Sequence, residues 1–291
     1  ELRDWVTELL KKNKDLALAF QQRFSGGSGA YTPQRVAEIT RAAVTSVSGR
    51  KRKLDVSEVK KIISLWDEVH ASIITDYLRH PADPGAFSNI AALLEICIDV
   101  ALSVKTTSKR MDKYPAELLT KLKAPLHDIR VESSWQKALD GFLSLLGENT
   151  YHHNAYLLQF LADICRVSEP PRSTYIAAGL MKWFDRMQAR GAYMAGSSVH
   201  LIFEIAVAQG LFRETPGRFK PIPFDNAYNI ALIDKLIEMG HLDTAARYCD
   251  RQIAGNYRDE FNVPYLQLLQ RIYTLKGDGR SLAGVLARLF P

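Results

Sequence analysis

Apolar residues recur at intervals of three and four along almost the whole chain, with polar residues between them. This spacing places the apolar side chains on one face of a helix with 3.6 residues per turn. The pattern is clearest over residues 57–78, where the apolar positions are Val59, Ile62, Ile63, Trp66, Val69, Ile73 and Tyr77. No run of alternating β-branched residues bounded by turn residues is present, so strands are not expected. The chain is predicted to be all-α, with about twelve to fourteen helices.

Capping residues indicate where individual helices begin and end. Thr32 followed by Pro33 is a favoured start for the run "TPQRVAEITRAAVTSV", and Asp55 or Ser57 suits the start of the helix over 57–78. The prolines of "RHPADP" end that helix, because proline cannot continue the hydrogen-bond ladder. Most connections are short, which favours antiparallel neighbours. The expected architecture is a set of antiparallel helical hairpins stacked as an irregular α-α superhelix.

Three longer stretches interrupt the helical pattern. They are "SGGSGAY" (25–31), "KTTSKRMDKYP" (105–115) and "FRETPGRFKPIPFD" (212–225). The polar break at 105–115 is the best place to divide the chain, and it predicts an amino-terminal helical subdomain over 1–110 and a hairpin-repeat subdomain over 111–291, unless the chain is one continuous domain. A break as long as 212–225 is often functional or partner-facing.

The carboxy-terminal quarter contains a pattern that occurs twice. Gly240, Leu242 and Ala245 stand at a glycine, two residues after it and five residues after it, and Gly277 begins a second copy 37 residues later in which the bulky Leu282 replaces the alanine. The pattern resembles the middle of a tetratricopeptide-like helical hairpin, whose repeat is roughly 34 residues long. The resemblance covers residues 226–291, and it implies a concave or extended binding surface. An irregular helical bundle without true repeats is the alternative.

A second resemblance concerns the first residues of the chain. "LRDWVTELLKKNKDLALAFQQRF" is a short helical run, a polar joint and a second helical run. It is similar to the helical region that accompanies SWIM-type zinc fingers. The Cys-x-Cys and Cys-x-His pairs of the finger itself are absent from this sequence, so the resemblance implies the helical companion alone.

Composition is that of an ordinary globular protein. The chain has 291 residues, 47% of them hydrophobic and 24% charged, which is enough to bury a large core. Its net charge of +6 permits an acidic partner such as nucleic acid without requiring one. No uninterrupted apolar run of membrane-spanning length is present, so no membrane association is expected. Because the first residue is Glu, we expect the chain to be a piece of a longer protein.

The three cysteines, Cys97, Cys165 and Cys249, are scattered inside apolar helical runs. An odd and scattered set does not form a disulfide framework, and it is typical of a reducing compartment. We therefore expect buried free thiols and an intracellular protein, in the cytoplasm or the nucleus.

No pattern of catalytic, cofactor-binding or metal-binding residues emerges from the histidines. His152 and His153 are adjacent, so on a helix they point about 100 degrees apart and do not converge on one metal ion. Asn154 is interpreted as the cap of the helix that follows. Asp67 and His70 have the spacing of a helical surface pair, and no nucleophile turn completes a catalytic set with them. We expect no catalytic residue, no cofactor and no metal site.

Basic and aromatic residues supply the candidates for partner binding. The run Arg50, Lys51, Arg52 and Lys53 suits phosphate contacts, or it is a solvated loop. Further basic residues occur in the two later breaks, namely Lys105, Lys109, Arg110, Arg213, Arg218 and Lys220. Phe212 and Phe219 alternate with the last three, either to stack on a partner or to pin the loop to the core.

These observations predict a non-enzymatic scaffold or adaptor that binds a protein or peptide along its helical hairpins. The candidate partner-binding residues are Phe212, Arg218, Phe219, Tyr257 and Tyr265. The alternative is a nucleic-acid-associated helical protein that contacts phosphates through residues 50–53, without sequence specificity. A third possibility is an enzyme whose site is assembled from scattered residues. The sequence does not indicate an oligomeric state.

Overall fold

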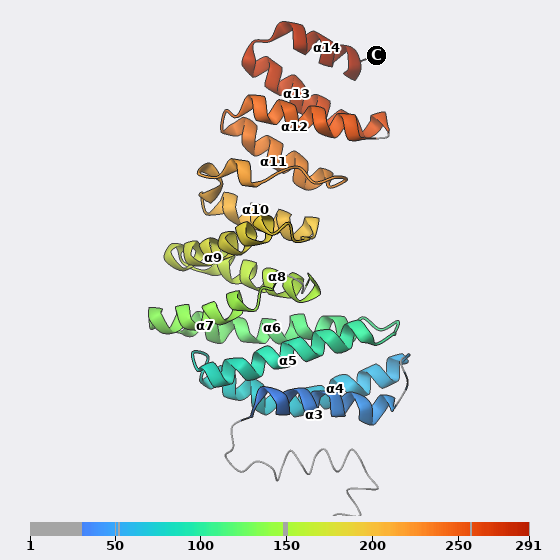
Figure 1. The fold of residues 1–291 in the computed structure, drawn as a ribbon, viewed down its shortest axis with the longest axis vertical. Coiled ribbons are helices and arrows are strands. Elements are labelled where there is room, and N and C mark those ends of the chain that lie inside the picture. Colours follow the sequence, from blue (N-terminus) through green and yellow to red (C-terminus); the bar gives the residue numbers. More distant parts are fainter. Residues whose placement is uncertain (1–30, 50, 52, 148–150, 257, 291) are drawn as a thin grey trace, which may run out of the picture. The chain divides into compact units, whose positions relative to one another are not determined.

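The computed structural model of the protein describes residues 31–49, 51, 53–147, 151–256 and 258–290. In these ranges the chain forms twelve α-helices and three short 3-10 helices, and no strands (Figure 1). The all-α prediction is therefore confirmed for the described residues. The chain divides into two compact units, with the boundary between Glu169 and Pro170. The break at 105–115, where the sequence suggested a boundary, lies inside the first unit.

The first unit begins with two consecutive hairpins, which two further helices follow. Its helices are α3 (Pro33–Ser48), α4 (Val56–Arg79), α5 (Pro84–Ser103), α6 (Arg110–Asp128), α7 (Glu132–Ser144) and α8 (Tyr151–Val167). The predicted caps are present: the Thr32 side chain accepts a hydrogen bond from the Arg35 amide, and Asp55 forms a capping box with Glu58 at the start of α4. Capping of this kind satisfies amide groups that have no partner within the helix.

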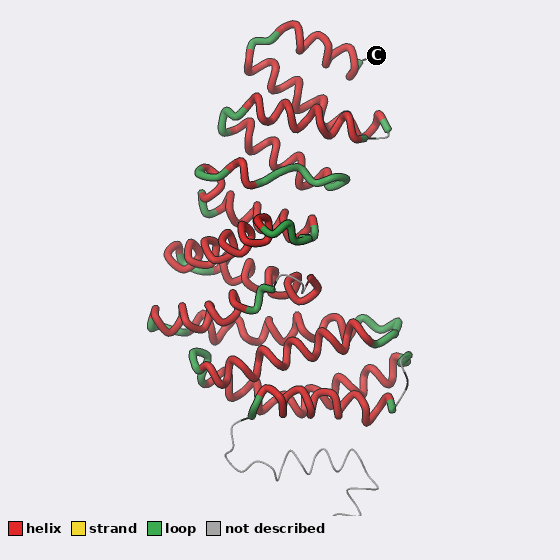
Figure 2. Tube along the Cα trace, in the orientation of Figure 1, coloured by secondary structure: helices red, strands yellow, loops and turns green. Residues whose placement is uncertain are grey.

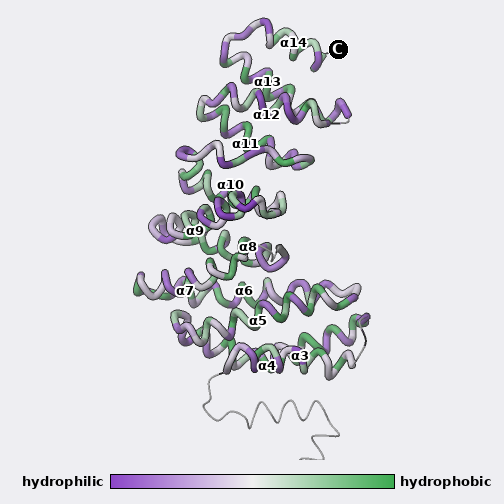
Figure 3. The backbone as a smooth tube through the Cα atoms, in the orientation of Figure 1, coloured by the Kyte–Doolittle hydropathy of each residue, from purple (hydrophilic) through white to green (hydrophobic). Residues whose placement is uncertain are grey.

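Helix α5 is the most apolar element of the first unit. Of the described helices, it alone has the length and composition of a membrane-spanning helix. Half of its most apolar window is buried, because α5 packs against α3, α4 and α6. Glu95 and Asp99 interrupt the apolar run, and both side chains are exposed. Figure 3 shows the resulting mixture of apolar and polar residues along the helices.

His70 is a core residue, so its interpretation as a surface partner of Asp67 is wrong. Its side chain is fully buried and joins three helices. Nε2 lies 2.9 Å from the Thr40 hydroxyl on α3, and Nδ1 lies 2.9 Å from the Tyr114 hydroxyl on α6. His70 is buried because it belongs to the apolar face of α4, where Trp66, His70, Ile73 and Tyr77 follow each other at intervals of four, three and four residues.

The second unit also consists of hairpins. Its helices are α9 (Pro170–Ala189), α10 (Gly196–Ala208), α11 (Asn226–Glu238), α12 (Leu242–Gly255), α13 (Val263–Lys276) and α14 (Gly279–Leu289), with the 3-10 helices η1 (Leu211–Arg213), η2 (Pro216–Arg218) and η3 (Asp259–Asn262). The three α-helical pairs α9–α10, α11–α12 and α13–α14 follow one another along the chain, and the members of each pair pack together.

The two carboxy-terminal hairpins turn in the same way, as the 37-residue spacing predicted. Gly240 has φ 78° and Gly277 has φ 67°, the left-handed conformation that ends a helix. The amides that follow, of His241 and Asp278, donate to carbonyl groups five residues earlier, at 2.9 and 3.0 Å. Ala245 is buried at the start of the returning helix. Residues 226–289 therefore form two successive helical hairpins whose glycine turns have the same conformation.

A segment without an α-helix takes the place of a returning α-helix between α10 and α11. Residues 212–225 run from the end of α10 back to its start (Figure 2), where Asp225 Oδ2 lies 2.7 Å from the position that a Cβ on Gly196 would occupy. Asp225 then caps α11 by accepting from the Tyr228 amide. Helices α10 and α11 therefore begin at the same end of the unit, and the 212–225 segment makes the antiparallel return between them.

Candidate functional site

The 212–225 segment is fixed to the core by the two phenylalanines that were candidates for partner binding. Phe212 and Phe219 are 1% and 0% exposed. The Phe219 ring stacks on Phe184 of α9 at a centroid distance of 5.0 Å. The Phe212 and Phe219 rings meet Phe203 of α10 edge-on, at 5.3 and 5.5 Å. Rings buried in this way offer no surface to a partner in this conformation. Of the two interpretations, pinning of the loop to the core is the one the structure has.

Polar contacts hold the same segment along its length. The Asn229 side chain accepts from the Ile222 amide at 2.8 Å and donates to the Ile222 carbonyl at 2.7 Å. Arg218 forms an ion pair with Asp185 at 2.9 Å, and Gln188 donates to the Arg218 carbonyl. The Arg218 side chain remains 41% exposed, so it is still accessible from solvent. The segment is a structural layer of the unit that keeps a polar outer side.

The candidate tyrosines do not form a described surface. Tyr265 is buried, and its hydroxyl donates to the Asn226 side chain at 2.8 Å, which links α13 to α11. Tyr257 lies outside the described residues. The aromatic residues that are exposed in the second unit are others, which the helical pattern did not single out: Tyr193, Phe224 and Phe290 are 77%, 79% and 76% exposed. Phe224 also has φ 64°, which is unusual for a residue other than glycine.

The first unit brings two basic stretches of the sequence together. Lys53 forms an isolated parallel bridge with Lys105, and the Leu54 amide donates to the Lys105 carbonyl at 3.0 Å. Residues 50–61 hold six basic and two acidic residues, and residues 105–113 hold four and one, so together they have a formal charge of +7. The net charge of the chain is +6, so the remaining residues are nearly neutral as a set.

We call the exposed cations beside this bridge the basic surface. Its described members are Lys51, Lys53, Lys105, Lys109, Arg110 and Lys113. Arg50 and Arg52, which belong to the same stretch of sequence, lie outside the described residues. Lys51 donates to Glu58 at 2.9 Å, and this hydrogen bond raises the pKa of the ammonium group above its usual value. Lys51 therefore stays charged at neutral pH, with part of its charge offset by Glu58.

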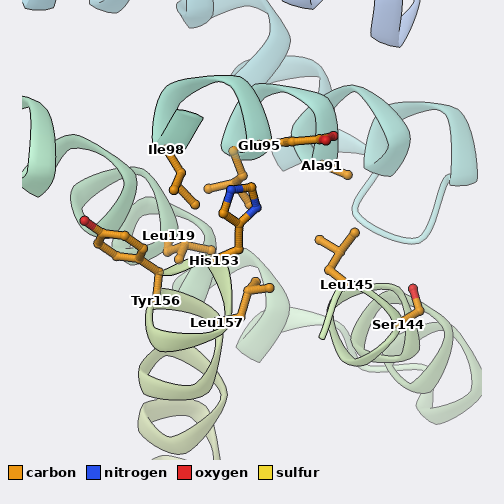
Figure 4. Close-up of a pocket in the computed structure, with 10 residues that line it drawn as sticks. Ala91, Glu95, Ile98, Leu119, Ser144, Leu145, His153, Tyr156 and Leu157 are labelled. Atoms are coloured by element: carbon orange, nitrogen blue, oxygen red, sulfur yellow. The ribbon is translucent and has the colours of Figure 1, made fainter. Parts of the chain in front are cut away.

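A pocket lies among α5, α6, α7 and α8 in the first unit (Figure 4). Its volume is about 270 Å³. Most of its wall is apolar, and the polar lining residues are Glu95, Ser144, His153 and Tyr156. In Figure 4 the His153 ring projects from α8 toward α5, into the space beneath Glu95 and Ile98. No basic lysine or arginine side chain is among the described residues that line this pocket.

Two hydrogen bonds fix the aromatic side of the pocket. His153 Nε2 lies 3.2 Å from Asp99 Oδ1, one helical turn beyond Glu95 on α5. The Tyr156 hydroxyl donates to the Asp112 carbonyl at 2.7 Å, and partial burial raises the pKa of this phenol, so it is neutral at physiological pH. The pairing of His153 with Asp99, 54 residues away in the sequence, could not be predicted from local spacing.

Asn154 does not cap α8, contrary to the sequence interpretation. It is the fourth residue of that helix, and its amide accepts from the Gly147 nitrogen at 3.1 Å and donates to the Gly147 carbonyl at 2.8 Å. Asn229, the fourth residue of α11, binds Ile222 in the same way. In both helices a buried asparagine therefore clamps the backbone seven residues earlier.

The described residues show no grouping of metal ligands or reactive thiols. No set of three or more His, Cys, Asp or Glu side chains among them is placed to hold a metal ion. None of the three cysteines forms a disulfide, and all three are buried. Burial raises the pKa of the Cys97 thiol well above its usual value and that of Cys249 to about 12. Such thiols are poor nucleophiles at neutral pH.

No protein-family model, curated protein or solved structure matches this chain.

Proposed function

We propose that the chain is a non-enzymatic interaction module that binds a partner protein along a tetratricopeptide-like array of hairpins in its second unit. The observation that supports this proposal is the repeated hairpin at Gly240 and Gly277. A hairpin that recurs with the same glycine turn builds an extended surface, and extended surfaces of this kind bind chains rather than enclose substrates.

The proposed contacts are the exposed aromatic residues of the second unit. Tyr193 and Phe224 come from two loops that meet where Gly196 approaches Asp225. Aromatic side chains supply much of the binding energy of protein interfaces when a partner buries them. Phe212, Phe219 and Tyr265 have a supporting role in this proposal, because they hold the exposed loops in place.

Capture of proteins from the lysate of the source cells tests the module. The chain is immobilised, and retained proteins are compared between wild type, the double variant Tyr193→Ser/Phe224→Ser, and the control Lys235→Ala, which changes an exposed ion pair on α11. A partner retained by wild type and the control, but lost from the double variant, is expected. Equal retention by all three proteins would place the interface elsewhere.

A second candidate function is polyanion binding, in particular of nucleic acid, through the basic surface. The observation in its favour is the Lys53–Lys105 bridge, because it joins two basic stretches that are separated by two helices in the sequence. Each phosphate neutralised by a lysine or arginine releases condensed counterions, so affinity falls steeply with salt. Binding through phosphates gives affinity without sequence specificity.

Fluorescent mixed-sequence duplex DNA and RNA test this candidate. Binding is measured at about 50 mM and 200 mM salt for wild type, for Lys53→Ala/Lys105→Ala/Lys109→Ala, and for a control in which three lysines elsewhere, at 137, 182 and 235, become alanine. With about three phosphate contacts removed, the slope of log affinity against log salt is expected to become smaller by about two to three. Equal slopes for wild type and the first variant would exclude the basic surface.

A further inference from the structure

We propose that the pocket among α5, α6, α7 and α8 binds one cationic side chain, an arginine or lysine of a partner protein. This inference names a chemical requirement of the partner, and it rests on the proposed interaction function. The site itself is in the first unit, whereas that function was assigned to hairpins of the second unit.

The size of the pocket limits what can enter it. Sites for small molecules and cofactors generally have volumes of about 300–1,000 Å³. At about 270 Å³, this pocket is smaller than that range. It has room for one long side chain, and a nucleotide or a flavin would not be enclosed by it.

The wall suits the stem of a long side chain. Apolar residues from all four helices contribute to it, namely Ala91, Leu94, Ile98, Leu119, Leu145 and Leu157. The methylene groups of arginine and lysine pack well on such a surface while the charged end stays near water. Tyr156 adds an aromatic face, and the face of a tyrosine ring attracts a cation.

The charge at the pocket selects a cation over a neutral or anionic group. Glu95 lines the pocket and is exposed, so it presents a carboxylate to a cation that enters. Asp99 follows one turn later on the same face of α5, half-exposed, and holds the His153 ring. An arginine or lysine end within reach of Glu95 forms a charge-assisted hydrogen bond, which is about twice as strong as a neutral one.

A peptide with one arginine provides the test. The probes are Ac-Gly-Leu-Arg-Leu-Gly-NH2, the same peptide with citrulline in place of arginine, and a third with norleucine. Citrulline keeps the shape and loses the charge. Binding to the whole chain is followed by two-dimensional NMR at pH 7.5, and the His153 ring and backbone amides near the pocket serve as reporters.

The expected result is saturable binding of the arginine peptide, with the largest shifts around His153 and Leu145, and at least tenfold weaker binding of the citrulline peptide. Glu95→Gln should weaken the arginine peptide about tenfold without changing the fold, because the residue is exposed and the two side chains have the same size. Ala91→Leu, which fills the pocket and keeps its charge, should also weaken binding. Glu68→Gln, an exposed carboxylate on α4, is the matched control and should bind as wild type.

Equal affinity for the arginine, citrulline and norleucine peptides would show an apolar pocket without charge selection and overturn the proposal. Absence of shifts at millimolar peptide would overturn it as well. The module proposal fails separately. If the arginine peptide binds but the hairpins capture no partner, the pocket proposal is supported and the hairpin proposal is contradicted. If the hairpins capture a partner but the arginine peptide does not bind, the hairpin proposal is supported and the pocket proposal is contradicted.

Discussion

Tyr114 and His70, 44 residues apart in the sequence, share a buried hydrogen bond of 2.9 Å between α6 and α4. The Thr40 hydroxyl donates its proton to the Val36 carbonyl at 2.8 Å, so it must accept from His70 Nε2. Nε2 then carries the ring proton, and Nδ1 accepts from the Tyr114 hydroxyl. The network is complete when the imidazole is neutral, because a second ring proton on Nδ1 would face the Tyr114 oxygen and displace its hydroxyl proton.

The stability of the protein should therefore fall in acid through His70. Burial, aided by the charge of Lys121, lowers the pKa of this imidazole from 6.5 to about 3. The unfolded chain takes up a proton below about pH 6.5 and the folded chain does not, so the contribution of His70 to stability is complete above that pH and is lost between about 6.5 and 3. The loss has a limiting slope of about 1.4 kcal/mol per pH unit.

Urea unfolding at pH 7.5, 6.5, 5.5 and 4.5 measures this effect. His70→Gln should be less stable than wild type at pH 7.5, and the gap should narrow by about 2.7 kcal/mol toward pH 4.5, since the variant has no titrating group at this position. The exposed His241→Gln variant should remain parallel to wild type. A constant gap between wild type and His70→Gln would contradict the linkage.

Two phenylalanines of the 212–225 segment should differ strongly in how much their truncation to alanine changes stability. Phe219 is packed among Phe184, Phe203 and Phe212, and Phe219→Ala should lower the free energy of unfolding by about 3–5 kcal/mol. Phe224 is exposed and has φ 64°, so Phe224→Ala should change stability by less than about 0.5 kcal/mol, and Phe224→Gly should raise it by up to about 1 kcal/mol. Denaturant melts of the three variants decide, and a large loss for Phe224→Ala would mean that its ring is packed.

Helical periodicity predicted the elements well and their partners poorly. Some features depend only on neighbours three to five residues away, which a sequence displays directly. They are the apolar stripe of α4, the caps at Thr32 and Asp55, and the hairpins at Gly240 and Gly277. Whether a phenylalanine in a long break turns inward depends on which helices lie behind it. Helical periodicity and composition therefore could not decide whether Phe212 and Phe219 contact a partner or pack in the core.

The candidate sites were harder to predict, because each is assembled from separate stretches. The bridge from Lys53 to Lys105 joins residues that are separated in the sequence by both α4 and α5. The pocket joins Glu95 of α5 to His153 of α8, and no local spacing connects them. His70 is different, because its spacing from Trp66 and Ile73 places it on the apolar face of α4. This spacing predicts a buried side chain, and it is better evidence than the nearby Asp67, which suggested a surface pair.

Alanine at the two hairpin glycines should be destabilising to a similar extent. Gly240→Ala and Gly277→Ala each place a Cβ on a backbone with positive φ, which costs about 1 kcal/mol. Neither position has a neighbouring atom within 4 Å of the added Cβ, so the cost is conformational and should be nearly equal in both hairpins. Thermal and urea unfolding measure it.

Gly284, inside α14, is the matched control for these two variants. Its added Cβ also meets open space, and its φ is not positive, so Gly284→Ala should raise stability by about 0.5–1 kcal/mol. The sign of the effect therefore separates helix propensity from turn geometry. If all three substitutions changed stability in the same direction, the glycine turns would not be what fixes the hairpins.

The asparagine clamps should contribute equally in the two units. Asn154→Ala leaves the amide and carbonyl of Gly147 without the side-chain partner, and Asn229→Ala does the same to Ile222. Because both asparagines are buried, each substitution should lower the free energy of unfolding by about 1–3 kcal/mol. Gln159→Ala removes an exposed amide that donates to Asp163, and it should change stability by less than about 0.5 kcal/mol.

Hydrogen exchange distinguishes a local clamp from general packing. In Asn229→Ala, the exchange rate of the Ile222 amide should rise by a larger factor than the rates of the amides in the middle of α11. Uniform acceleration across the second unit would mean that Asn229 acts through packing alone.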